Sequence, residues 1–137
     1  MKEGAFNTLW RLNLAQLLDN QSSQWEQIKT SSTPKPISHH NGWIHDEKLY
    51  IFGGVQGMDS NNSIFELDLN SGSWSKFDLD PESAVPEARD DHSYYYDKES
   101  ASLYIFGGYV GGGKSNDLWK LSMTDKKWTM IMDNEEE

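Results

Sequence analysis

The sequence of 137 residues contains no cysteine, which excludes disulfide bonds, thiolate metal sites and a cysteine nucleophile. It has no apolar run approaching the roughly 18 residues that a membrane-spanning helix needs. The first 14 residues mix charges, amides and Trp, unlike the apolar stretch of a signal peptide. We therefore expect a cytoplasmic protein with no membrane partner.

Basic side chains are also scarce, since 12 Lys and Arg stand against 22 Asp and Glu for a formal net charge of -10. This balance disfavours a nucleic-acid partner, because such surfaces are basic. Hydrophobic residues make up only 36% of the chain, but they include 6 Trp, 6 Tyr and 5 Phe. That much large apolar surface is atypical of a disordered acidic chain and predicts a folded core built from large side chains.

A six-residue run repeats within the chain. Leu-Tyr-Ile-Phe-Gly-Gly occupies positions 49–54 and recurs letter for letter at 103–108, 54 positions later. Each run is followed by a Trp 20 positions after its second Gly, at Trp74 and Trp128. A fixed period of this length is typical of proteins in which one structural unit is copied along the chain.

The similarity extends upstream of the run and into a third, partial copy. The segment 7–12 resembles 116–121, which places the second half of another unit at the start of the chain. Upstream residues of the two full copies correspond at an offset of 52. At this offset Pro34 corresponds to Pro86 and His40 to His92. In the partial copy, Trp25 takes the place of Trp128.

Each full copy predicts four short strands. In the last copy the first strand lies near 92–96, and the second, 103–106, is apolar at nearly every position, as in a central strand covered on both faces. The third strand alternates apolar and polar residues with the period of two that defines a strand. The fourth contains the Trp, and residues 14–18 fit one helical turn. The alternating positions are Phe65, Leu67 and Leu69, then Trp119, Leu121 and Met123, and in the partial copy Trp10, Leu12 and Leu14.

Together these residues resemble the kelch-repeat family. The Gly-Gly doublet after an apolar strand, the Asn-x-Leu-aromatic strand, the Trp 20 positions later and the period near 50 all match its pattern. Pro86, Arg89 and His92 also match the opening of a kelch repeat, whereas Ile37 takes the place of the Arg in the earlier copy. The resemblance implies an all-β fold of kelch-type β-propeller blades, each a four-stranded antiparallel sheet with its Trp between successive blades.

The predicted organisation is an incomplete ring. We expect the outer half of a blade at 1–32, full repeats at 33–80 and 81–132, and an acidic tail at 133–137. Propellers close with typically about 4 to 8 blades, so two and a half blades do not close alone. We expect a piece of a longer propeller, with assembly of several copies as the alternative, because open blade edges favour self-association.

Patterns that would indicate chemistry are weak. The stretch from Gly108 to Gly113-Lys114-Ser115 fits a phosphate-binding loop, but an alternating strand follows it where such a loop needs a helix. His39, His40 and His45 cluster in sequence, but the repeat already explains His40. We therefore predict no catalytic residue, no metal site and no cofactor.

The loops after second and fourth strands are expected on one face of a propeller, where scaffold proteins carry their binding residues. These loops are 29–36, 55–62, 78–86 and 109–116. Tyr109 and Arg89 are the expected anchors, because Tyr and Arg are enriched at binding hot spots. The predicted contact residues are Gln56, Met58, Asp59, Arg89, Tyr109 and Lys114.

The family resemblance implies a protein-interaction or scaffold module whose partner is another protein. The alternative that the resemblance leaves open is part of a kelch-fold enzyme whose active site is completed by missing blades. Copper-dependent sugar oxidases and iron-assisted plant specifier proteins are such relatives. The Cys-linked tyrosyl chemistry of the oxidases is excluded by the absence of Cys.

Overall fold

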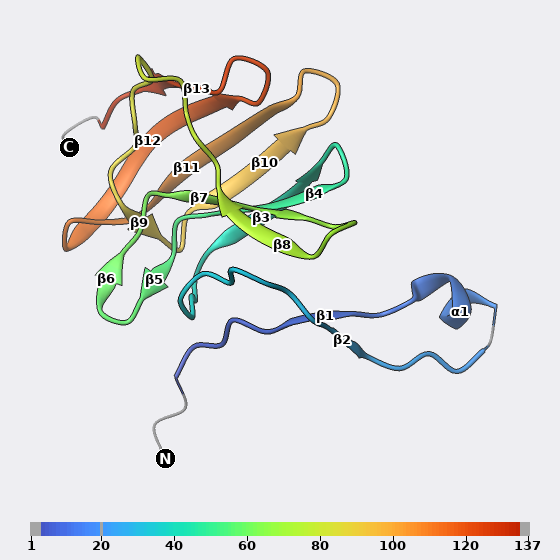
Figure 1. The fold of residues 1–137 in the computed structure, drawn as a ribbon. Coiled ribbons are helices and arrows are strands. Elements are labelled where there is room, and N and C mark those ends of the chain that lie inside the picture. The colour runs from blue at the N-terminus through green and yellow to red at the C-terminus, as the bar shows by residue number, and fades with distance from the viewer. Residues whose placement is uncertain (1–3, 20, 135–137) are drawn as a thin grey trace.

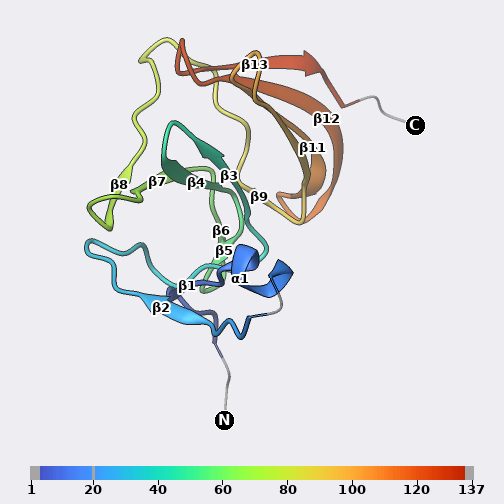
Figure 2. The same cartoon turned by 90° about the vertical axis from the view of Figure 1, so that its right-hand side faces the viewer.

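The computed structural model describes residues 4–19 and 21–134. The chain forms a two-stranded hairpin followed by two larger antiparallel sheets that pack face to face in chain order (Figures 1 and 2). The first of these sheets has four strands, and the second has four strands in sequence plus one short strand paired to its edge. We name these three units the half-blade, the middle blade and the last blade. The expected all-β arrangement of antiparallel sheets is confirmed, and none of the sheets formed by the described residues is closed.

The half-blade pairs β1 (Leu9–Arg11) with β2 (Glu26–Ile28), and the connection carries the expected helical turn, α1 (Leu14–Leu18). The middle blade has the order β3 (Asn41–His45), β4 (Lys48–Phe52), β7 (Ile64–Asp68), β8 (Ser73–Lys76). The last blade has the order β10 (Ser93–Asp97), β11 (Ser102–Val110), β12 (Gly113–Ser122), β13 (Lys127–Met132). Two short elements complete the fold, a hairpin of β5 (Val55–Gln56) with β6 (Asp59–Ser60), and β9 (Arg89–Asp90), which pairs with β11.

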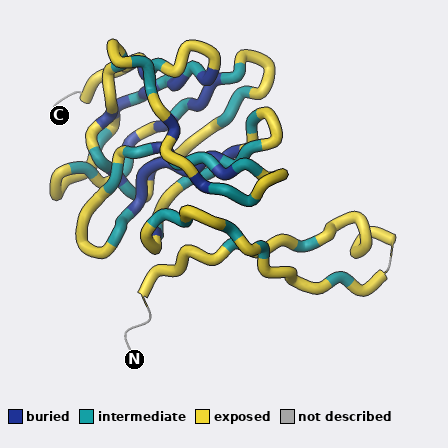
Figure 3. Tube along the Cα trace, viewed as in Figure 1, coloured by how far each residue is buried: buried dark blue, intermediate teal, exposed yellow. Residues whose placement is uncertain are grey.

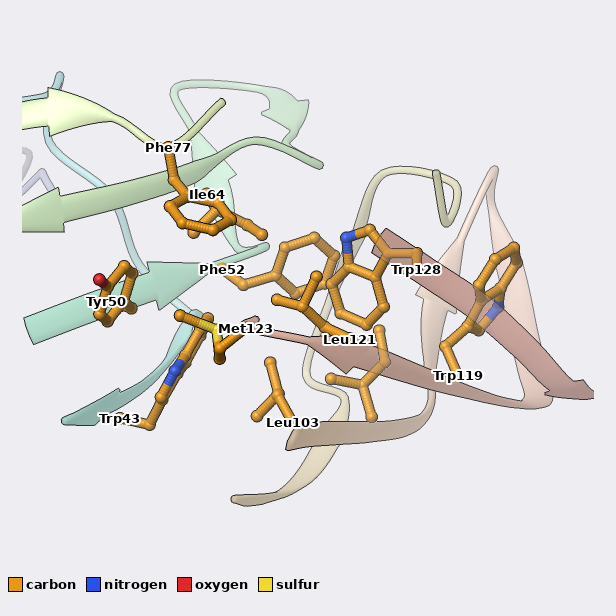
Figure 4. Packing of buried hydrophobic residues seen from close by; sticks show 11 residues of the cluster. Trp43, Tyr50, Phe52, Ile64, Phe77, Leu103, Trp119, Leu121, Met123 and Trp128 are labelled. Carbon is orange, nitrogen blue, oxygen red and sulfur yellow. The ribbon is translucent and has the colours of Figure 1, made fainter. Parts of the chain in front are cut away.

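The main core lies between the middle and last blades (Figure 4). Phe52 of β4 contacts Trp128 of β13, with ring centroids 5.1 Å apart. Leu103 and Leu121 of the last blade are buried in the same cluster. Trp128 therefore fills the space between successive sheets, as the repeat pattern predicts. Trp74 takes the same place toward the half-blade, where Leu9 packs against its cluster.

The two central strands differ in how they are covered. In β4, Tyr50 and Phe52 are buried against the last blade, while Ile51 is buried on the opposite face. In β11, Ile105 is buried but Phe106 is exposed. The expectation of coverage on both faces is thus correct for the middle blade only, because none of the described residues forms a sheet against the outer face of the last blade.

Burial is also low in the half-blade, which is almost entirely exposed in Figure 3. The alternation places Trp10 and Leu14 on the same face of one strand, but both are exposed, and Leu14 begins α1. Leu69 was expected beside Leu67 and is exposed because β7 ends one residue before it. Alternation predicts the face of a strand, but burial also requires a neighbouring sheet.

The connections between blades, residues 29–36 and 78–86, do not run entirely along the face on which the sequence analysis expects them. Residues 78–86 pass beside the β12–β13 turn, where the amide of Asp80 donates to the carbonyl of Lys126 at 2.9 Å. Ser31 lies equivalently beside the β7–β8 turn, its amide donating to the carbonyl of Gly72 at 2.9 Å. These segments satisfy backbone groups at the edges of the outer strands. The middle of each segment therefore lies toward the opposite end of the blades from the β5–β6 and β11–β12 hairpins. Pro86 returns to the hairpin end, where its carbonyl accepts from Asn62 Nδ2 at 3.2 Å, so the expectation that all four loops share one face is correct only in part.

The Gly-Gly doublets mark points where the backbone of another segment approaches closely. Gly53 has φ 72°, and a Cβ there would lie 2.6 Å from His92 Cε1 and 2.7 Å from the carbonyl oxygen of Arg89. Gly108 has φ 101°, and its Cβ would lie 2.6 Å from the carbonyl oxygen of Asp90. Both the positive φ and the contact require glycine.

Candidate binding face

Two hairpins project from the same end of the middle and last blades (Figure 1). In the β5–β6 hairpin, Gln56 and Asp59 are paired and the two turn residues are Gly57 and Met58. Gly57 has φ 72°, and Gly at the first turn position is the arrangement of a type II′ turn. This turn holds the Met58 side chain in solvent, where it is 98% exposed.

The β11–β12 hairpin is a direct extension of the last blade. Tyr109 and Lys114 are paired in it, and the turn residues Gly111 and Gly112 have φ 57° and 91°. Positive φ at both positions is the requirement of a type I′ turn, whose twist matches that of the flanking strands. The Tyr109 hydroxyl donates to the carbonyl of Gly112 at 2.9 Å, which fixes the ring across the turn.

Strand β9 connects the two hairpins. Asp90 is paired with Tyr109 of β11, and the Ser60 hydroxyl of β6 donates to Asp90 Oδ1 at 3.2 Å. The structure therefore brings five of the six predicted contact residues to one continuous surface, which we name the hairpin face. It contains Gln56, Met58, Asp59, Tyr109 and Lys114.

The hairpin face also contains residues that sequence reasoning did not select. Asp90 and Asp91 lie beside Tyr109, and Asp91 borders a shallow depression of about 310 Å³ with Tyr109 and Lys114. Together with Asp59 they give the face three carboxylates against the ammonium group of Lys114. The signal that could have identified them is their position just before the first strand of the last repeat, next to the repeated His.

The sixth predicted contact residue, Arg89, is not on this surface. Its side chain is 1% exposed and forms a two-point ion pair with Asp117, Nη1 to Oδ1 at 2.6 Å and Nη2 to Oδ2 at 2.8 Å. Nη1 also donates to the carbonyl of Gly107 at 2.9 Å. With its donors directed inward, Arg89 holds the last blade together and is unavailable to a partner.

Asp117 collects further donors around this ion pair. Trp119 Nε1 donates to Oδ2 at 2.6 Å, and the Ser115 hydroxyl donates to Oδ1. Burial by itself raises the pKa of the carboxyl group, but the hydrogen bonds from Arg89, Ser115 and Trp119 outweigh it and lower the pKa to about 2. Asp117 is therefore ionised throughout the physiological range.

His92 is a second buried titratable residue behind the hairpin face. It is 5% exposed and packs edge-to-face against Phe52 at 5.3 Å. Burial, followed by the positive charge of Arg89, lowers its pKa to about 4, although Asp90 and Asp91 act in the opposite direction. A neutral imidazole at neutral pH fits the apolar space between the blades.

The pattern typical of phosphate-binding loops lies entirely within the β11–β12 hairpin. Gly113, Lys114 and Ser115 open a strand rather than a helix, so the amide cluster that binds phosphate at a helix start is not formed. Within residues 4–19 and 21–134, no three His, Asp or Glu side chains gather as they would around a metal ion. In the same ranges, no helix is both long and apolar enough to cross a bilayer.

The repeated four-stranded sheets, the inter-blade Trp and the Gly-Gly contacts define a protein of the β-propeller repeat class. Within that class, the KLHDC2/KLHL20/DRC7 Kelch-repeats domain matches residues 1–136. The chain belongs to this kelch-repeat family, and the resemblance inferred from its motifs is confirmed.

Individual relatives are similar over most of this chain. Human Kelch domain-containing protein 3 is 31% identical over 127 residues, covering 83% of this chain and 32% of that protein. Human Host cell factor 2 is 30% identical over 138 residues, covering 83% of this chain and 17% of that protein. Kelch domain-containing protein 10 of Xenopus tropicalis is 26% identical over 137 residues, covering 94% of this chain and 30% of that protein. The chain thus spans less than a third of the length of each of these relatives.

Proposed function

We propose that this chain is a protein-interaction and scaffold module that binds a partner protein through the hairpin face. The observation that carries the proposal is the Met58 side chain, 98% exposed at the tip of a tight hairpin. Binding residues lie disproportionately on loops that a rigid scaffold holds in place, as the two hairpins are held here. Membership of the kelch-repeat family supports the same role.

The hairpin face is pre-organised for binding. The type I′ turn, the Tyr109 hydrogen bond to Gly112 and the Ser60 link to Asp90 hold both hairpins in place before a partner arrives. A fixed surface loses little conformational freedom on association, so more of the contact energy appears as affinity.

The chemistry of the face indicates the kind of partner segment. Met58 and the half-exposed Tyr109 supply apolar contact, while Asp59, Asp90 and Asp91 supply negative charge around them. We propose that the partner presents Lys or Arg side chains beside an apolar residue, because such a segment is complementary in charge to this surface.

We also propose that the chain acts as an arc of a larger propeller. Two full blades and a half-blade fall short of the roughly 4 to 8 blades that close a ring. Further blades would cover the exposed face of the last blade and complete the half-blade.

Affinity capture with the whole chain tests the hairpin face. Proteins retained by the wild type are identified, and the binding of each purified candidate is measured against Met58→Asp combined with Tyr109→Ala. Loss of two exposed anchors should weaken a true partner by at least about tenfold. Leu69→Asp is the matched control, because it also places a carboxylate at an exposed apolar position, but beside the β7–β8 turn at the other end. Equal binding by all three proteins would refute the proposed face.

A further inference from the structure

A hydroxyl, an imidazole and a carboxylate lie in contact between the middle and last blades. The Tyr96 hydroxyl of β10 lies 2.6 Å from Nδ1 of His45, the last residue of β3. Nε2 of the same ring lies 3.3 Å from Oδ2 of Asp46. We name these three residues the triad. Strand β4 runs from the triad to the β5–β6 hairpin, so the triad lies at the opposite end of the blades from the hairpin face.

The carboxylate of Asp46 determines which ring nitrogen of His45 is the base. An ionised carboxylate only accepts hydrogen bonds, so it favours the imidazole tautomer that carries its proton on Nε2. Nδ1 then has a free lone pair and accepts from the Tyr96 hydroxyl. A hydroxyl, a base within hydrogen-bond reach and a third group that orients the base are the parts of an activated nucleophile.

Tyr96 needs such a base at physiological pH. Burial, followed by the negative charges of Asp46 and Asp97, raises the pKa of its phenol above the ordinary value of 10.0. The phenol is therefore neutral at physiological pH, and a neutral hydroxyl is a weak nucleophile. Transfer of its proton to His45 during a reaction removes this limit.

Aromatic contacts hold the two rings of the triad in place. The Tyr96 ring packs edge-on to the imidazole, with centroids 6.0 Å apart, and its centroid lies 6.5 Å from that of Trp43. The Tyr50 ring is a third neighbour, 6.4 Å from the imidazole. Because Trp43 and Tyr50 are buried in the main core, core packing fixes the hydroxyl and its base relative to one another.

The β3–β4 turn gives Asp46 an unusual backbone conformation. His45 is paired with Lys48, so Asp46 and Glu47 are the two turn residues, and their φ values are 45° and 60°. Positive φ at both positions is the requirement of a type I′ turn, which Asn and Gly adopt most readily. Residues other than Gly in this conformation cluster at functional sites. Here the turn brings the Asp46 carboxylate back to the ring of the preceding residue.

The repeat does not account for the triad. At the offset of 52, His45 corresponds to Asp97 and Tyr96 to Ile44, so neither residue is copied. Both strands belong to complete blades, and the contact between them does not depend on what covers the two ends of the stack. The triad also borders solvent, since the His45 side chain is 21% exposed and that of Asp46 is 87% exposed. A reagent can therefore approach it from outside.

We propose that Tyr96 is a nucleophile that accepts acyl groups, with His45 as its general base and Asp46 as the residue that orients the imidazole. The donor is an activated ester or thioester, whose leaving group departs readily. The Tyr96 oxygen attacks the carbonyl carbon and forms a new ester bond, while its proton moves to Nδ1 of His45. The bond from the carbonyl carbon to the leaving group breaks, and the leaving group takes that proton. This activity goes beyond the interaction role and does not involve the hairpin face.

Acetylation of the full chain by 4-nitrophenyl acetate at neutral pH tests the proposal. Trypsin releases residues 90–98 as one peptide that contains Tyr94, Tyr95 and Tyr96, so fragmentation in the mass spectrometer compares all three. Tyr94 is 46% exposed and Tyr95 66% exposed, and these more accessible phenols are the internal controls. We expect Tyr96 to be acetylated at least about tenfold faster than either, because a positioned general base contributes about 100-fold or more.

Variants of His45 and Asp46 show whether the imidazole is the base. His45→Ala should lower the acetylation rate of Tyr96 to that of Tyr94, and free imidazole in the buffer should restore part of it. Asp46→Asn should also slow Tyr96, and Asn tolerates the left-handed turn conformation. Met58→Asp at the hairpin face is the matched control and should react like the wild type. Circular dichroism checks that each variant retains the fold.

Three outcomes would overturn the proposal. The first is equal acetylation of the three tyrosines in the wild type. The second is a Tyr96 rate that Asp46→Asn leaves unchanged, a test at an exposed side chain that does not disturb the core. The third is a loss in His45→Ala that imidazole does not rescue, because the ring would then have only a structural role. None of these outcomes bears on the hairpin face, whose test measures the binding of a partner.

Discussion

Arg89 and Asp117 form a buried ion pair in the last blade that the middle blade replaces with uncharged residues. Ile37 occupies the position equivalent to Arg89, and Ser63 the position equivalent to Asp117. Trp119, whose indole N–H donates to Asp117, corresponds to Phe65 in the middle blade, and a phenyl ring has no N–H to donate. The last blade thus carries a charged, hydrogen-bonded set at these positions and the middle blade an uncharged set.

We expect this set to behave as a unit in stability measurements. Asp117→Ala leaves the Arg89 charge buried and unpaired, which should cost about 3 to 5 kcal/mol in the free energy of unfolding. The triple change Arg89→Ile, Asp117→Ser, Trp119→Phe transfers the residues of the middle blade and leaves no buried charge. Urea denaturation should find the triple variant more stable than Asp117→Ala, and the opposite order would contradict a coupled set.

Acid should weaken the fold through Asp117. Its pKa falls from an ordinary value of 3.8 to about 2 in the folded chain, so the unfolded state binds a proton first as the pH drops. The stabilisation is complete above pH 4 and is lost between about pH 4 and 2, with a magnitude near 2 kcal/mol. Urea unfolding at several pH values should show a smaller acid loss for the triple variant, which lacks this carboxylate.

His92 should produce a separate loss at milder pH. Its pKa is about 4 in the fold against an ordinary 6.5, so between these values the unfolded chain is protonated while the folded chain is neutral. Stability is therefore full above about pH 6.5 and falls toward pH 4, by an amount of order 3 kcal/mol. His92→Gln has no such proton equilibrium. Its unfolding free energy should change less between pH 7.5 and 5 than that of the wild type, with a remainder from His40, whose pKa is also lowered by burial. A wild-type slope in this variant would exclude His92 as the cause.

Trp128 and Trp25 occupy equivalent repeat positions in opposite environments. Trp128→Ala removes a buried ring in contact with Phe52 and should cost about 3 to 5 kcal/mol. Trp25→Ala removes a ring that is 65% exposed and should cost less than about 1 kcal/mol in the single copy. Thermal melts at a concentration where sedimentation shows monomer test the pair. An unchanged melt for Trp128→Ala would contradict its place between the blades.

Substitution of Gly53 and of Gly57 distinguishes the cost of a left-handed backbone from the cost of a steric clash. Both residues have φ 72°, so the backbone cost is the same at the two positions. Nothing lies within 4 Å of a Cβ added at Gly57, whereas one at Gly53 would clash with His92 and the carbonyl of Arg89. Gly57→Ala should cost about 1 kcal/mol for the left-handed conformation alone. Gly53→Ala should cost clearly more in urea denaturation, and equal losses would show that the close approach contributes nothing.

The repeat pattern predicted most of the architecture. The period-two alternation predicts the strands, and the repeat predicts the order of the blades. The spacing between the Gly-Gly doublet and the Trp predicts the place of Trp128. All of these signals lie within short stretches of sequence. The exposure of Trp10 and Leu14 did not follow, because alternation specifies a face but not whether another sheet covers it.

The composition of the hairpin face followed from the sequence in part. The exposure of Tyr109 and Lys114 in a loop was predictable, because both lie between two strands that the repeat identifies. The burial of Arg89 was missed because its partner, Asp117, is 28 residues away in sequence, and only the fold brings the two together. The path of residues 78–86 was missed for the same reason, since their hydrogen bonds to Lys126 and Trp128 are long-range.

The distribution of tryptophan gives this chain a built-in optical reporter. Trp43, Trp74, Trp119 and Trp128 are buried, while Trp10 and Trp25 lie in water. The emission should therefore contain a blue component, protected from acrylamide quenching, and a red component that acrylamide quenches readily. Burial of Trp10 and Trp25 by any partner would convert the second component into the first, so such binding can be followed in unlabelled protein.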